Sequence, residues 1–493
     1  MSTHTPTRTQ AMPERHTTRT RRHSHHALLR RGMRHRRWQA RTGDLLEILA
    51  LASLLAVVVQ FLRLGGSHDL LSGTAATSLI AVGRITGLVS ADLILIQILL
   101  SARLPWVDRV YGMDRALKAH RILGRITVPL VLVHVEALVL GYAVRDGLSA
   151  WVGWAVEPFR MLAGVPDMLT ATAATALLVL IAVTSVRAAK QAMGYERWHL
   201  VHIGAYAAVA LSLPHQLSIG SDLTRTPWAK AYWVLLYAAV AASVVWWRAL
   251  VPLVRTLRHD LRVDRVIEEA PGTWSVWLRG RDLNRLPARA GQYLGWRFLA
   301  PGLWATAHPW SLSSLPDGRH LRVTVRDLGD HSRQIASLRP GTRALIEGPY
   351  GGFTTRGRTR SRVLLLAAGV GITPVRAILE ELVRTNAAPA GHVTLVYRAD
   401  REDQLALRAE LQKLARAGGH RLVFLVGPPV QGSWLPAGMP GRDDAARLAS
   451  VVPEVASHEA YLCGPAPWMA LVHRSLRRSG IPQSHIHDER FAW

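Results

Sequence analysis

Residues 120–134 read HRILGRITVPLVLVH, an apolar helical segment with a histidine at each end. The 14-residue spacing of His120 and His134 is about 40° short of four full helical turns. Both imidazoles therefore lie on one face of the helix, about 21 Å apart along its axis. The surrounding apolar stretch, residues 122–144, is about long enough to cross the hydrocarbon core of a membrane.

Five further apolar stretches of similar length flank this segment. The sequence thus predicts six membrane spans, at residues 45–62, 78–101, 122–144, 168–186, 199–220 and 231–251. An even number of spans places both termini on one side. Most lysines and arginines fall on that side, whereas the opposite loops hold only Arg145, Arg160, Arg225 and Lys230. The positive-inside rule therefore predicts a multi-pass plasma-membrane protein with cytoplasmic N- and C-termini.

Charge and cysteine content exclude several other classes of protein. The net charge of +26 is absorbed by the cytoplasmic side, so it does not indicate nucleic-acid binding. The single cysteine, Cys463, excludes an intramolecular disulfide and an iron–sulfur cluster held by four cysteines of this chain. Residues 1–43 are rich in Arg, His and Thr without an apolar core, which predicts a disordered basic tail rather than a signal peptide.

A second histidine pair, His202 and His215, lies in a span that runs in the same direction through the bilayer. Their 13-residue spacing leaves the side chains about 140° apart on an ideal helix. Pro214 can break the hydrogen-bond ladder and turn His215 inward, and His199 is an alternative inner ligand. Imidazole is an axial ligand of haem iron. Histidine depth therefore predicts an inner haem on His120 and His202, and an outer haem on His134 and His215.

Three charged residues, Arg84, Asp92 and Glu136, fall within predicted spans, where such groups are expensive and by default functional. Arg84 lies on the outer side, where it is expected to pair with a haem propionate or to attract an anionic or oxygen-derived acceptor. An ion pair between Arg84 and Asp92, or snorkelling of the arginine, is an equally good explanation.

The pattern of apolar and polar residues changes after Arg262. Short alternating runs broken by Gly and Pro predict a small antiparallel barrel over residues 260–358. Wholly apolar strands then alternate with helical segments over residues 359–493, as in a parallel α/β domain. The predicted fold is a six-helix transmembrane bundle at residues 44–252, followed by an antiparallel β-barrel and an α/β nucleotide-binding domain.

Several short motifs stand in order behind the membrane part. They are HPWSLSS at 308–314, VRDLGDHS at 325–332, EGPYG at 347–351, AAGVGITP at 367–374 and YLCGP at 461–465. Together with the histidine pairs they resemble the ferric reductase and NADPH oxidase flavocytochrome family, over nearly everything from residue 45 onward. The resemblance implies a transmembrane oxidoreductase that moves electrons from cytoplasmic NAD(P)H through FAD and two b-type haems to an acceptor outside.

The resemblance assigns FAD to the first two motifs. It implies that four residues lie against the isoalloxazine and ribityl chain: His308, Pro309, Trp310 and Ser311. Position 310 more usually holds Phe or Tyr in the family. Arg326 is expected on the FAD pyrophosphate, since a guanidinium fork matches phosphate oxygens, with Ser332 as a further donor. Gly348 and Gly351 belong to the third cofactor-binding motif.

The dinucleotide site is predicted at the turn after strand 363–368. This turn follows a buried strand and precedes a helix, so its backbone amides can face a pyrophosphate. The expected binding residues are Gly369, Gly371, Thr373 and Pro374, joined by Gly464 and Pro465. Arg398 and Arg401 follow the strand ending at Tyr397 and are expected to bind the 2′-phosphate, which favours NADPH while leaving NADH possible.

Three residues are expected where hydride is transferred. In similar reductases the cysteine of the last motif, here Cys463, lies near the meeting point of nicotinamide and flavin. The C-terminal HDERFAW resembles the family's closing segment, in which an aromatic shields the flavin face. Phe491 is the first candidate for this role and Trp493 the second. Simple packing is the alternative for all three residues.

The terminal acceptor stays open. The family likeness covers reduction of oxygen to superoxide and reduction of ferric chelates, both on the outer side. The alternative is a membrane electron-relay subunit that donates to a specific extracytoplasmic partner protein. A soluble-type reductase with only a membrane anchor would contain no haem.

Overall fold

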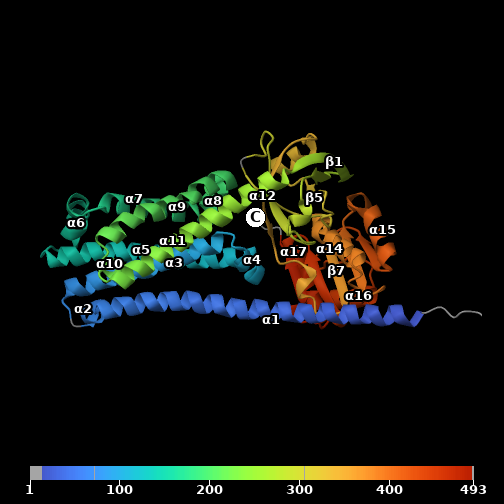
Figure 1. Cartoon of the computed structure of the whole chain (residues 1–493), viewed down its shortest axis with the longest axis horizontal. Coiled ribbons are helices and arrows are strands. Elements are labelled where there is room, and N and C mark those ends of the chain that lie inside the picture. Colours follow the sequence, from blue (N-terminus) through green and yellow to red (C-terminus); the bar gives the residue numbers. More distant parts are fainter. Residues whose placement is uncertain (1–13, 72, 305, 491–493) are drawn as a thin grey trace, which may run out of the picture. The chain divides into compact units, whose positions relative to one another are not determined.

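The computed structural model describes residues 14–71, 73–304 and 306–490, without the side chains of residues 14–26, Tyr195 and Asp330. It separates into two compact units (Figure 1). The helical unit comprises Arg41–Leu253, and the sheet unit comprises Met1–Ala40 together with Val254–Trp493. The chain passes between the units within two helices, α1 (Glu14–Phe61) and α12 (Val251–His259).

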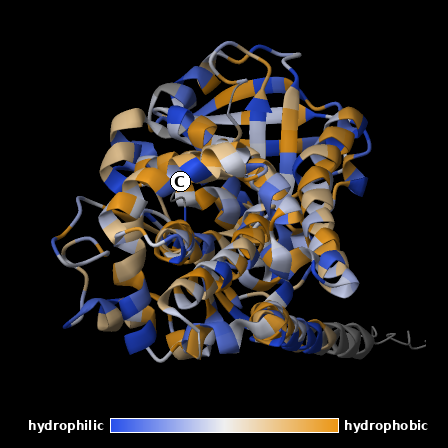
Figure 2. Ribbon diagram, turned by 90° about the vertical axis from the view of Figure 1, so that its left-hand side faces the viewer, coloured by the Kyte–Doolittle hydropathy of each residue, from blue (hydrophilic) through white to orange (hydrophobic). Residues whose placement is uncertain are grey.

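Long apolar helices joined by short ones build the helical unit. The long helices are α1, α3 (Ala75–Ser101), α5 (Met113–Arg145), α7 (Met168–Thr184), α9 (Tyr195–Ser218) and α11 (Pro227–Val244). The short ones are α2 (Ser67–Leu71), α4 (Pro105–Tyr111), α6 (Ala150–Gly164), α8 (Arg187–Met193) and α10 (Ser221–Thr224). Large apolar side chains such as Leu51, Leu200 and Leu235 are exposed, and apolar residues are spread over these helices in Figure 2. Such an outer surface suits lipid.

Not all six predicted spans are confirmed. Four helical stretches of the described residues are long and apolar enough to cross a membrane: Ala27–Leu71, Ala75–Ser101, Met113–Arg145 and Pro227–His259. A bent pair, Met168–Thr184 with Arg187–Met193, adds at most a fifth. Helix α9 (Tyr195–Ser218), which contains most of the predicted span 199–220, is not among them. We attribute this to the polar residues at its ends, Glu196 and Arg197 before the apolar stretch and His215 and Gln216 after it.

The N-terminal segment differs from the predicted disordered tail. Residues 14–43 belong to α1, a helix of 48 residues, while residues 1–13 lie outside the described part of the chain. Extending an existing helix costs far less than starting one, so an apolar span can propagate into a basic segment. Tertiary packing adds to this: a Cβ atom on Gly32 would lie 1.9 Å from the carbonyl oxygen of Arg358. Glycine allows the helix to approach this loop of the sheet unit.

The first half of the sheet unit contains two antiparallel three-stranded sheets. One has the order β1-β2-β5 (Arg262–Ala270, Thr273–Arg279, His320–Arg326), the other the order β4-β3-β6 (His308–Ser311, Tyr293–Phe298, Ala344–Tyr350). Apolar side chains from both sheets fill one core. Single bridges, Leu312 to Val323 and Arg262 to Arg343, join their edges. The predicted antiparallel barrel is not confirmed, because among the described residues only these bridges join the two sheets.

A parallel sheet forms the second half, as the alternation of apolar strands and helical segments predicts. Its order is β11-β10-β7-β8-β9, from Ile486–Glu489, His458–Cys463, Arg362–Ala368, Val393–Ala399 and Arg421–Val426. The helices are α14 (Ile372–Arg384), α15 (Arg408–Gly418), α16 (Asp444–Val451) and α17 (Ala466–Arg478). Along β7, Leu365 and Ala367 enter one apolar core, and Leu364 and Leu366 enter another on the opposite face. Both faces are therefore covered, as parallel sheets require.

Candidate functional site

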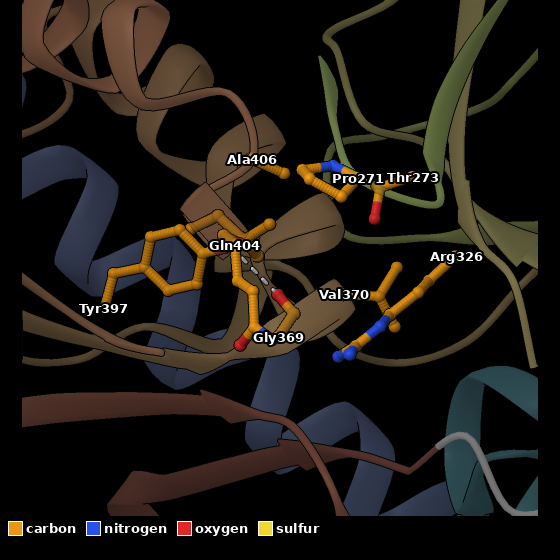
Figure 3. A pocket seen from close by; sticks show the side chains of 9 residues that line it. Pro271, Thr273, Arg326, Gly369, Val370, Tyr397, Gln404 and Ala406 are labelled. Atoms are coloured by element: carbon orange, nitrogen blue, oxygen red, sulfur yellow. Dashed lines mark hydrogen bonds between the residues drawn. The ribbon is translucent and has the colours of Figure 1, made fainter. Parts of the chain in front are cut away.

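A pocket in the sheet unit brings together segments from both of its halves (Figure 3). The β1–β2 hairpin, the end of β5, the turn after β7 and the loop after β8 all contribute to it. Its lining residues are Pro271, Thr273, Arg326, Gly369, Val370, Ile372, Tyr397, Gln404 and Ala406. The Arg326 Nη1 atom lies 3.3 Å from the position that a Cβ atom would take on Gly369. Two motifs that are distant in sequence therefore meet here.

The turn at residues 369–371 needs its glycines. Gly369 has a φ of +53°, and a Cβ atom on Gly371 would lie 2.1 Å from the carbonyl oxygen of Cys463. The hydroxyl of Tyr397 donates to the Gly369 carbonyl at 3.2 Å (Figure 3). Burial raises the pKa of Tyr397, so this hydroxyl stays protonated. Because α14 begins directly after the turn, amides of its first turn are available to an anionic ligand.

The remaining nucleotide-site residues gather around the same turn. Thr373 and Pro374 are buried in the first turn of α14. A Cβ atom on Gly464 would lie 3.1 Å from Ala368, and Pro465 caps the start of α17. The structure thus brings the predicted segments 369–374 and 463–465 together at the carboxyl ends of two neighbouring strands, β7 and β10.

Cys463 is a buried residue of this sheet. It is fully inaccessible and pairs in register with Ala367 on β7 and Glu489 on β11. Burial, with the charges of Glu489 and Asp488, raises the pKa of the Cys463 thiol well above its usual range. A neutral thiol is a poor nucleophile, and this one lies beside the turn after β7. The other two residues expected at the hydride-transfer site, Phe491 and Trp493, lie outside the described residues.

Strand β4 consists of the four predicted flavin residues, His308–Ser311. The rings of His308 and Trp310 stack with centroids 5.4 Å apart, on either side of the half-buried Pro309. Ser311 is 3% exposed, and its hydroxyl has no hydrogen-bond partner within the described part of the chain. An unpaired buried hydroxyl is costly. An aromatic face with a spare hydroxyl is therefore what the structure offers a planar heterocyclic ligand such as a flavin.

Ser332 already has partners within its own loop. Its hydroxyl accepts a hydrogen bond from the Leu328 amide at 2.8 Å and donates to the Gly329 carbonyl at 2.9 Å. The structure therefore commits Ser332 to shaping the loop that follows Arg326. Of the predicted flavin residues after β4, Arg326 alone lines the pocket described above.

Gly348 and Gly351 serve the backbone at the end of β6. Their φ angles are +104° and +96°, which side chains rarely adopt. Arg255 donates to the Gly348 carbonyl, and the Gln292 side-chain amide donates to the Gly351 carbonyl at 3.1 Å. These glycines allow the bend that follows the strand.

The two predicted 2′-phosphate arginines differ in exposure. Arg398 is 5% exposed and donates to the carbonyls of Ala399 and Leu425. Arg401 is exposed and makes two hydrogen bonds of 3.0 Å to the carboxylate of Asp403. Neither guanidinium lines the pocket of Figure 3.

In the helical unit, the inner histidines of α5 and α9 face one another. The rings of His120 and His202 lie 6.0 Å apart between centroids and are inclined by 71°. His120 Nδ1 lies 3.0 Å from the carbonyl oxygen of Gln97, which makes Nδ1 the protonated nitrogen and leaves Nε2 with a free lone pair. His199, the alternative inner ligand, packs its ring near Trp198 at 6.4 Å.

The outer histidines also belong to α5 and α9. His134 Nδ1 lies 2.7 Å from the carbonyl oxygen of Gly83, and a Cβ atom on Gly87 would lie 2.5 Å from the same nitrogen. His215 lies close enough to His134 for the charges of the two rings to influence each other. Its Nδ1 is buried and finds no partner among the described residues. Helix α9 continues through Pro214 to Ser218, so the proline does not end it.

The intramembrane charges have partners that the sequence did not predict. Arg84 pairs with Asp69 at 2.7 Å and with both carboxylate oxygens of Asp222 at 2.6 and 2.7 Å. One alternative explanation, an ion pair between Arg84 and Asp92, is wrong. Asp92 instead accepts a hydrogen bond from the Ser53 hydroxyl at 2.6 Å. Arg84 is therefore held by two carboxylates rather than left available for an anion.

Asp69 and Asp222 were missed because they lie outside the predicted spans, on α2 and α10. The sequence offered one clue, since acidic residues just outside predicted spans can neutralise an arginine within a span. Glu136 also has a partner, the indole N–H of Trp154 at 3.2 Å.

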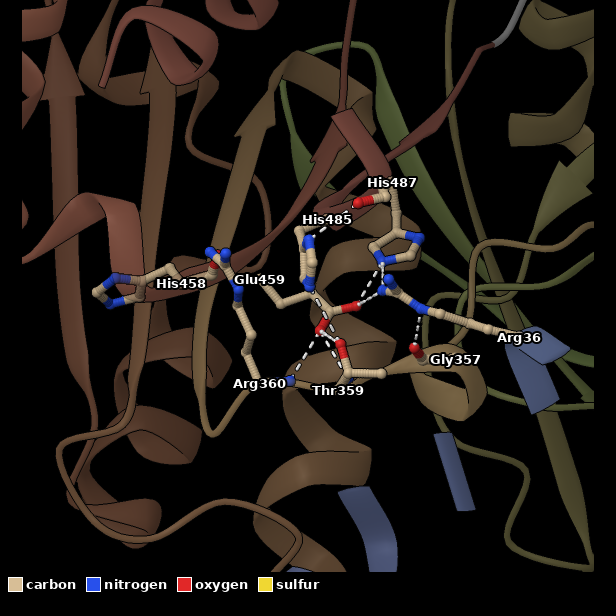
Figure 4. A network of polar contacts seen from close by, with 9 residues as sticks. Arg36, Gly357, Thr359, Arg360, His458, Glu459, His485 and His487 are labelled. Atoms are coloured by element: carbon tan, nitrogen blue, oxygen red, sulfur yellow. Dashed lines mark hydrogen bonds and ion pairs between the residues drawn. The ribbon is translucent and has the colours of Figure 1, made fainter. Parts of the chain in front are cut away.

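A buried polar network on β10 and β11 was also missed (Figure 4). Glu459 is fully buried and accepts hydrogen bonds from Arg36 of α1 and from His487 Nε2, the latter at 2.7 Å. Arg36 Nε also donates to the Gly357 carbonyl at 2.6 Å. Burial tends to raise the pKa of Glu459, but the bonds from His487 and the Thr359 amide hold it below its usual value. Spacing along the chain gives no sign of such a long-range contact.

Two family models match the chain. Residues 86–213 match the ferric reductase like transmembrane component, and residues 365–474 match the oxidoreductase NAD-binding domain. The first range contains His120, His134 and His202, and the second contains the glycine turn and Cys463.

Curated relatives match about half of the chain. The chain is 32% identical to the ferredoxin reductase component of 3-ketosteroid-9-alpha-monooxygenase from Mycolicibacterium smegmatis, over 47% of this chain and 65% of that protein. It is 30% identical to ferredoxin–NADP reductase B from Sorangium cellulosum, over 41% of this chain and 84% of that protein. The chain is 23% identical to the flavohemoprotein of Bacillus subtilis, over 61% of this chain and 76% of that protein. The chain thus spans just under two thirds of the length of the first of these relatives.

Among solved structures, the chain is similar to the FAD/NAD binding domain of nitric oxide dioxygenase from Vibrio cholerae. The identity is 23%, over 48% of this chain and 99% of that one, with a TM-score of 0.40. A likeness at this score supports no functional argument.

Proposed function

Because the chain belongs to the ferric reductase and NADPH oxidase flavocytochrome family, we propose that this NAD(P)H-dependent oxidoreductase carries electrons across a membrane. The donor is cytoplasmic NAD(P)H, and the path runs through FAD and two b-type haems to an acceptor on the outer side. Membership of this family is supported by a ferric reductase-like membrane part joined to a ferredoxin reductase-type module.

One observation carries the proposal, the facing of His120 and His202 at 6.0 Å between ring centroids. Two metal–nitrogen bonds of about 2 Å, plus about 1 Å from each nitrogen to its ring centre, add up to about 6 Å. These residues would hold one haem iron between them. His134 and His215 would hold the second haem. When bound, FAD and the haems supply the conversion of a two-electron donor into single electrons and the carriers that cross the bilayer.

The chain's own residues orient those groups. The carbonyls of Gln97 and Gly83 fix the tautomer of His120 and His134, so that Nε2 is presented as the ligand atom. The ring angle of 71° sets the two inner imidazoles nearly perpendicular to each other. No side chain need act as an acid or a base in these steps.

At the flavin end, Ser311 would donate to the isoalloxazine while His308, Pro309 and Trp310 line its face. Arg326 would hold the FAD pyrophosphate, and Ser332 would shape the adjoining loop. The segments 369–374 and 463–465 would cradle the NAD(P)H pyrophosphate. Phe491, or failing that Trp493, would shield the flavin face from the nicotinamide.

For the membrane topology we propose six spans with α9 as the fifth. The histidines and polar ends of α9 lower its mean hydropathy. Haem bound on the face that carries His202 and His215 would cover these polar side chains with an apolar ring. The distribution of lysine and arginine supports cytoplasmic N- and C-termini in the plasma membrane. Electrons would then leave on the outer side, at His134 and His215.

Oxygen and ferric chelates are the acceptors that fit a family of this kind, with a specific extracytoplasmic protein as the alternative. Arg84 is already held by Asp69 and Asp222, so it is not expected to bind an anionic acceptor directly. Comparing superoxide formation with ferric-chelate reduction by the purified, haem-loaded protein distinguishes the small-molecule acceptors.

The proposal is tested by haem content and a reduced-minus-oxidised spectrum of the purified full chain with FAD. We expect two low-spin b-type haems per chain and their reduction by NAD(P)H without oxygen. A chain that reduces its flavin but holds no haem would contradict the transmembrane path.

A further inference from the structure

The loop after β8 lies at the same edge of the sheet as the glycine turn. β7 and β8 are neighbouring parallel strands, with Ala368 paired to Arg398. Gln404 and Ala406, from this loop, line the pocket together with Gly369 (Figure 3). In dinucleotide-binding sheets of this kind, a carboxylate in the first unit binds the ribose 2′-hydroxyl of NADH, whereas an arginine nearby accommodates the 2′-phosphate of NADPH. The side chains of this loop therefore bear on which dinucleotide is bound.

Arg398 is occupied with the sheet itself. Its side chain is 6% exposed, and its guanidinium donates to the carbonyls of Ala399 and Leu425 at the ends of β8 and β9. Turning it outward to a phosphate would remove these bonds, which costs free energy. Arg398 thus links the ends of β8 and β9 through its hydrogen bonds.

The other arginines of the loop have carboxylate partners. Arg401 is bidentate to Asp403 at 3.0 Å, and Arg408 pairs with Glu402. Over residues 398–408 the arginines are Arg398, Arg401 and Arg408, and the acids are Asp400, Glu402 and Asp403, so the formal charges cancel. A phosphate dianion arriving here would have to displace a carboxylate from an arginine. The phosphate would meet no net positive charge in this loop.

Asp400 is the remaining charged group. It directly follows β8, its side chain is 58% exposed, and its Oδ1 lies 3.5 Å from Arg398. An exposed carboxylate in this place can accept hydrogen bonds from a ribose hydroxyl and repels a phosphate.

We propose that this site selects NADH over NADPH, with Asp400 accepting from the adenosine ribose and Arg401 withheld from the 2′-position by Asp403. The inference rests on the proposed function in one respect, the binding of a dinucleotide at the Gly369 turn. It replaces the expectation that Arg398 and Arg401 bind a 2′-phosphate.

The first test compares ADP-ribose with its 2′-phosphorylated form, by calorimetric titration of the FAD-loaded full chain, and NADH with NADPH in anaerobic flavin reduction. We expect NADH and ADP-ribose to be favoured at least about tenfold, because a charge-assisted hydrogen bond is gained and a repulsion avoided. Equal values, or a preference for the phosphorylated ligand, overturn the inference. Flavin reduction without haem reduction would count against the transmembrane path and leave this preference intact. Binding of neither ligand would overturn it along with the assignment of the turn.

Two variants make the test independent of misfolding. Asp403→Asn releases Arg401 and is expected to raise kcat/KM for NADPH about fivefold to tenfold through KM, a gain that damage to the fold does not produce. Asp400→Ala is expected to raise the KM for NADH about tenfold with little change in kcat. Asp264→Asn removes the partner of Arg265 on β1 and is the matched control. It is expected to leave kcat/KM unchanged for both NADH and NADPH. An unchanged NADPH to NADH ratio in both loop variants would overturn the roles given to Asp400 and Asp403.

Discussion

The two histidine-bearing helices of the membrane part differ in what holds their rings. On α5, both Nδ1 atoms face backbone carbonyls of α3, at 3.0 Å for His120 and 2.7 Å for His134. On α9, His202 has a 3.4 Å contact from Nδ1 to the Ser185 hydroxyl and a stacked Trp198 at 4.9 Å. His215 Nδ1 is buried without a hydrogen-bond partner among the described residues.

The difference shows that α3 holds the α5 ring of each proposed haem site through a backbone carbonyl, and that among the described residues the α9 rings have weaker contacts at Nδ1. A backbone carbonyl is a rigid acceptor that fixes both tautomer and ring angle, whereas a stacked ring or a long contact leaves rotation possible. Two glycines of α3 belong to this preparation. Gly83 supplies the acceptor and Gly87 leaves room for the His134 ring. We therefore expect α5 to be preorganised and α9 to adjust when haem binds.

Replacing a ligand should have the strongest consequence. In His134→Leu we expect loss of the outer haem and of acceptor reduction, with flavin reduction by NAD(P)H retained, because the electron path is cut beyond the inner haem. Haem content and stopped-flow spectra measure this. His199→Leu is the control and should keep both haems, since His202 is the ring that faces His120. Loss of the inner haem in the control would show that His199 is the ligand.

A methyl group on α3 should damage the site without removing a ligand. Gly87→Ala places a Cβ atom 2.5 Å from His134 Nδ1, so the ring must move from its carbonyl. We expect outer-haem affinity to fall about 10-fold to 100-fold, as when a ligand's hydrogen-bond partner is lost. Haem retention during dilution reports this. Gly204→Ala on α9, where the nearest atom is 3.5 Å away, should behave like the unaltered protein. Equal losses in both variants would contradict a special role for α3.

Removing haem from the intact protein should affect α9 more than α5. The α5 rings would keep their bonds to α3, whereas the α9 rings would lose the proposed iron that orients them. Hydrogen exchange of the haem-free and haem-loaded chain should show about a tenfold larger loss of protection in α9. Similar losses in the two helices would contradict the greater preorganisation of α5.

A change at the weakest contact should matter least. Ser185→Ala removes a 3.4 Å contact to His202 that is long for a hydrogen bond. We expect both haems to remain and the inner-haem midpoint potential to change by less than about 30 mV, that is, by less than about 0.7 kcal/mol for one electron. A potentiometric titration measures it. A larger shift would mean that Ser185 orients His202 as firmly as α3 orients the α5 rings.

Much of the candidate site could be predicted from local pattern. The depth of the four histidines follows from helical rise, and the turn before α14 follows from a buried strand, two glycines and a helix start. These features depend on residues close in sequence, where the backbone geometry is known in advance. The parallel sheet was predictable for the same reason.

The partners of charged groups were not predictable in this way. Arg84 finds Asp222, 138 residues away, and Arg36 finds Glu459, 423 residues away. Such pairs form because burying one charge requires another, but several candidates satisfy that requirement equally well until the chain has folded. The sequence alone likewise suggested that Arg398 was free to bind phosphate, whereas folding placed it against two strands.

Residue pattern was thus enough to establish an apolar bundle with histidines at two depths and a nucleotide-type sheet behind it, because periodicity along one chain segment sets which side chains share a face. Folding in three dimensions supplied the orientation of each ring, the partner of each buried charge and the availability of each arginine. These depend on atoms that meet across hundreds of residues, and no local rule specifies them.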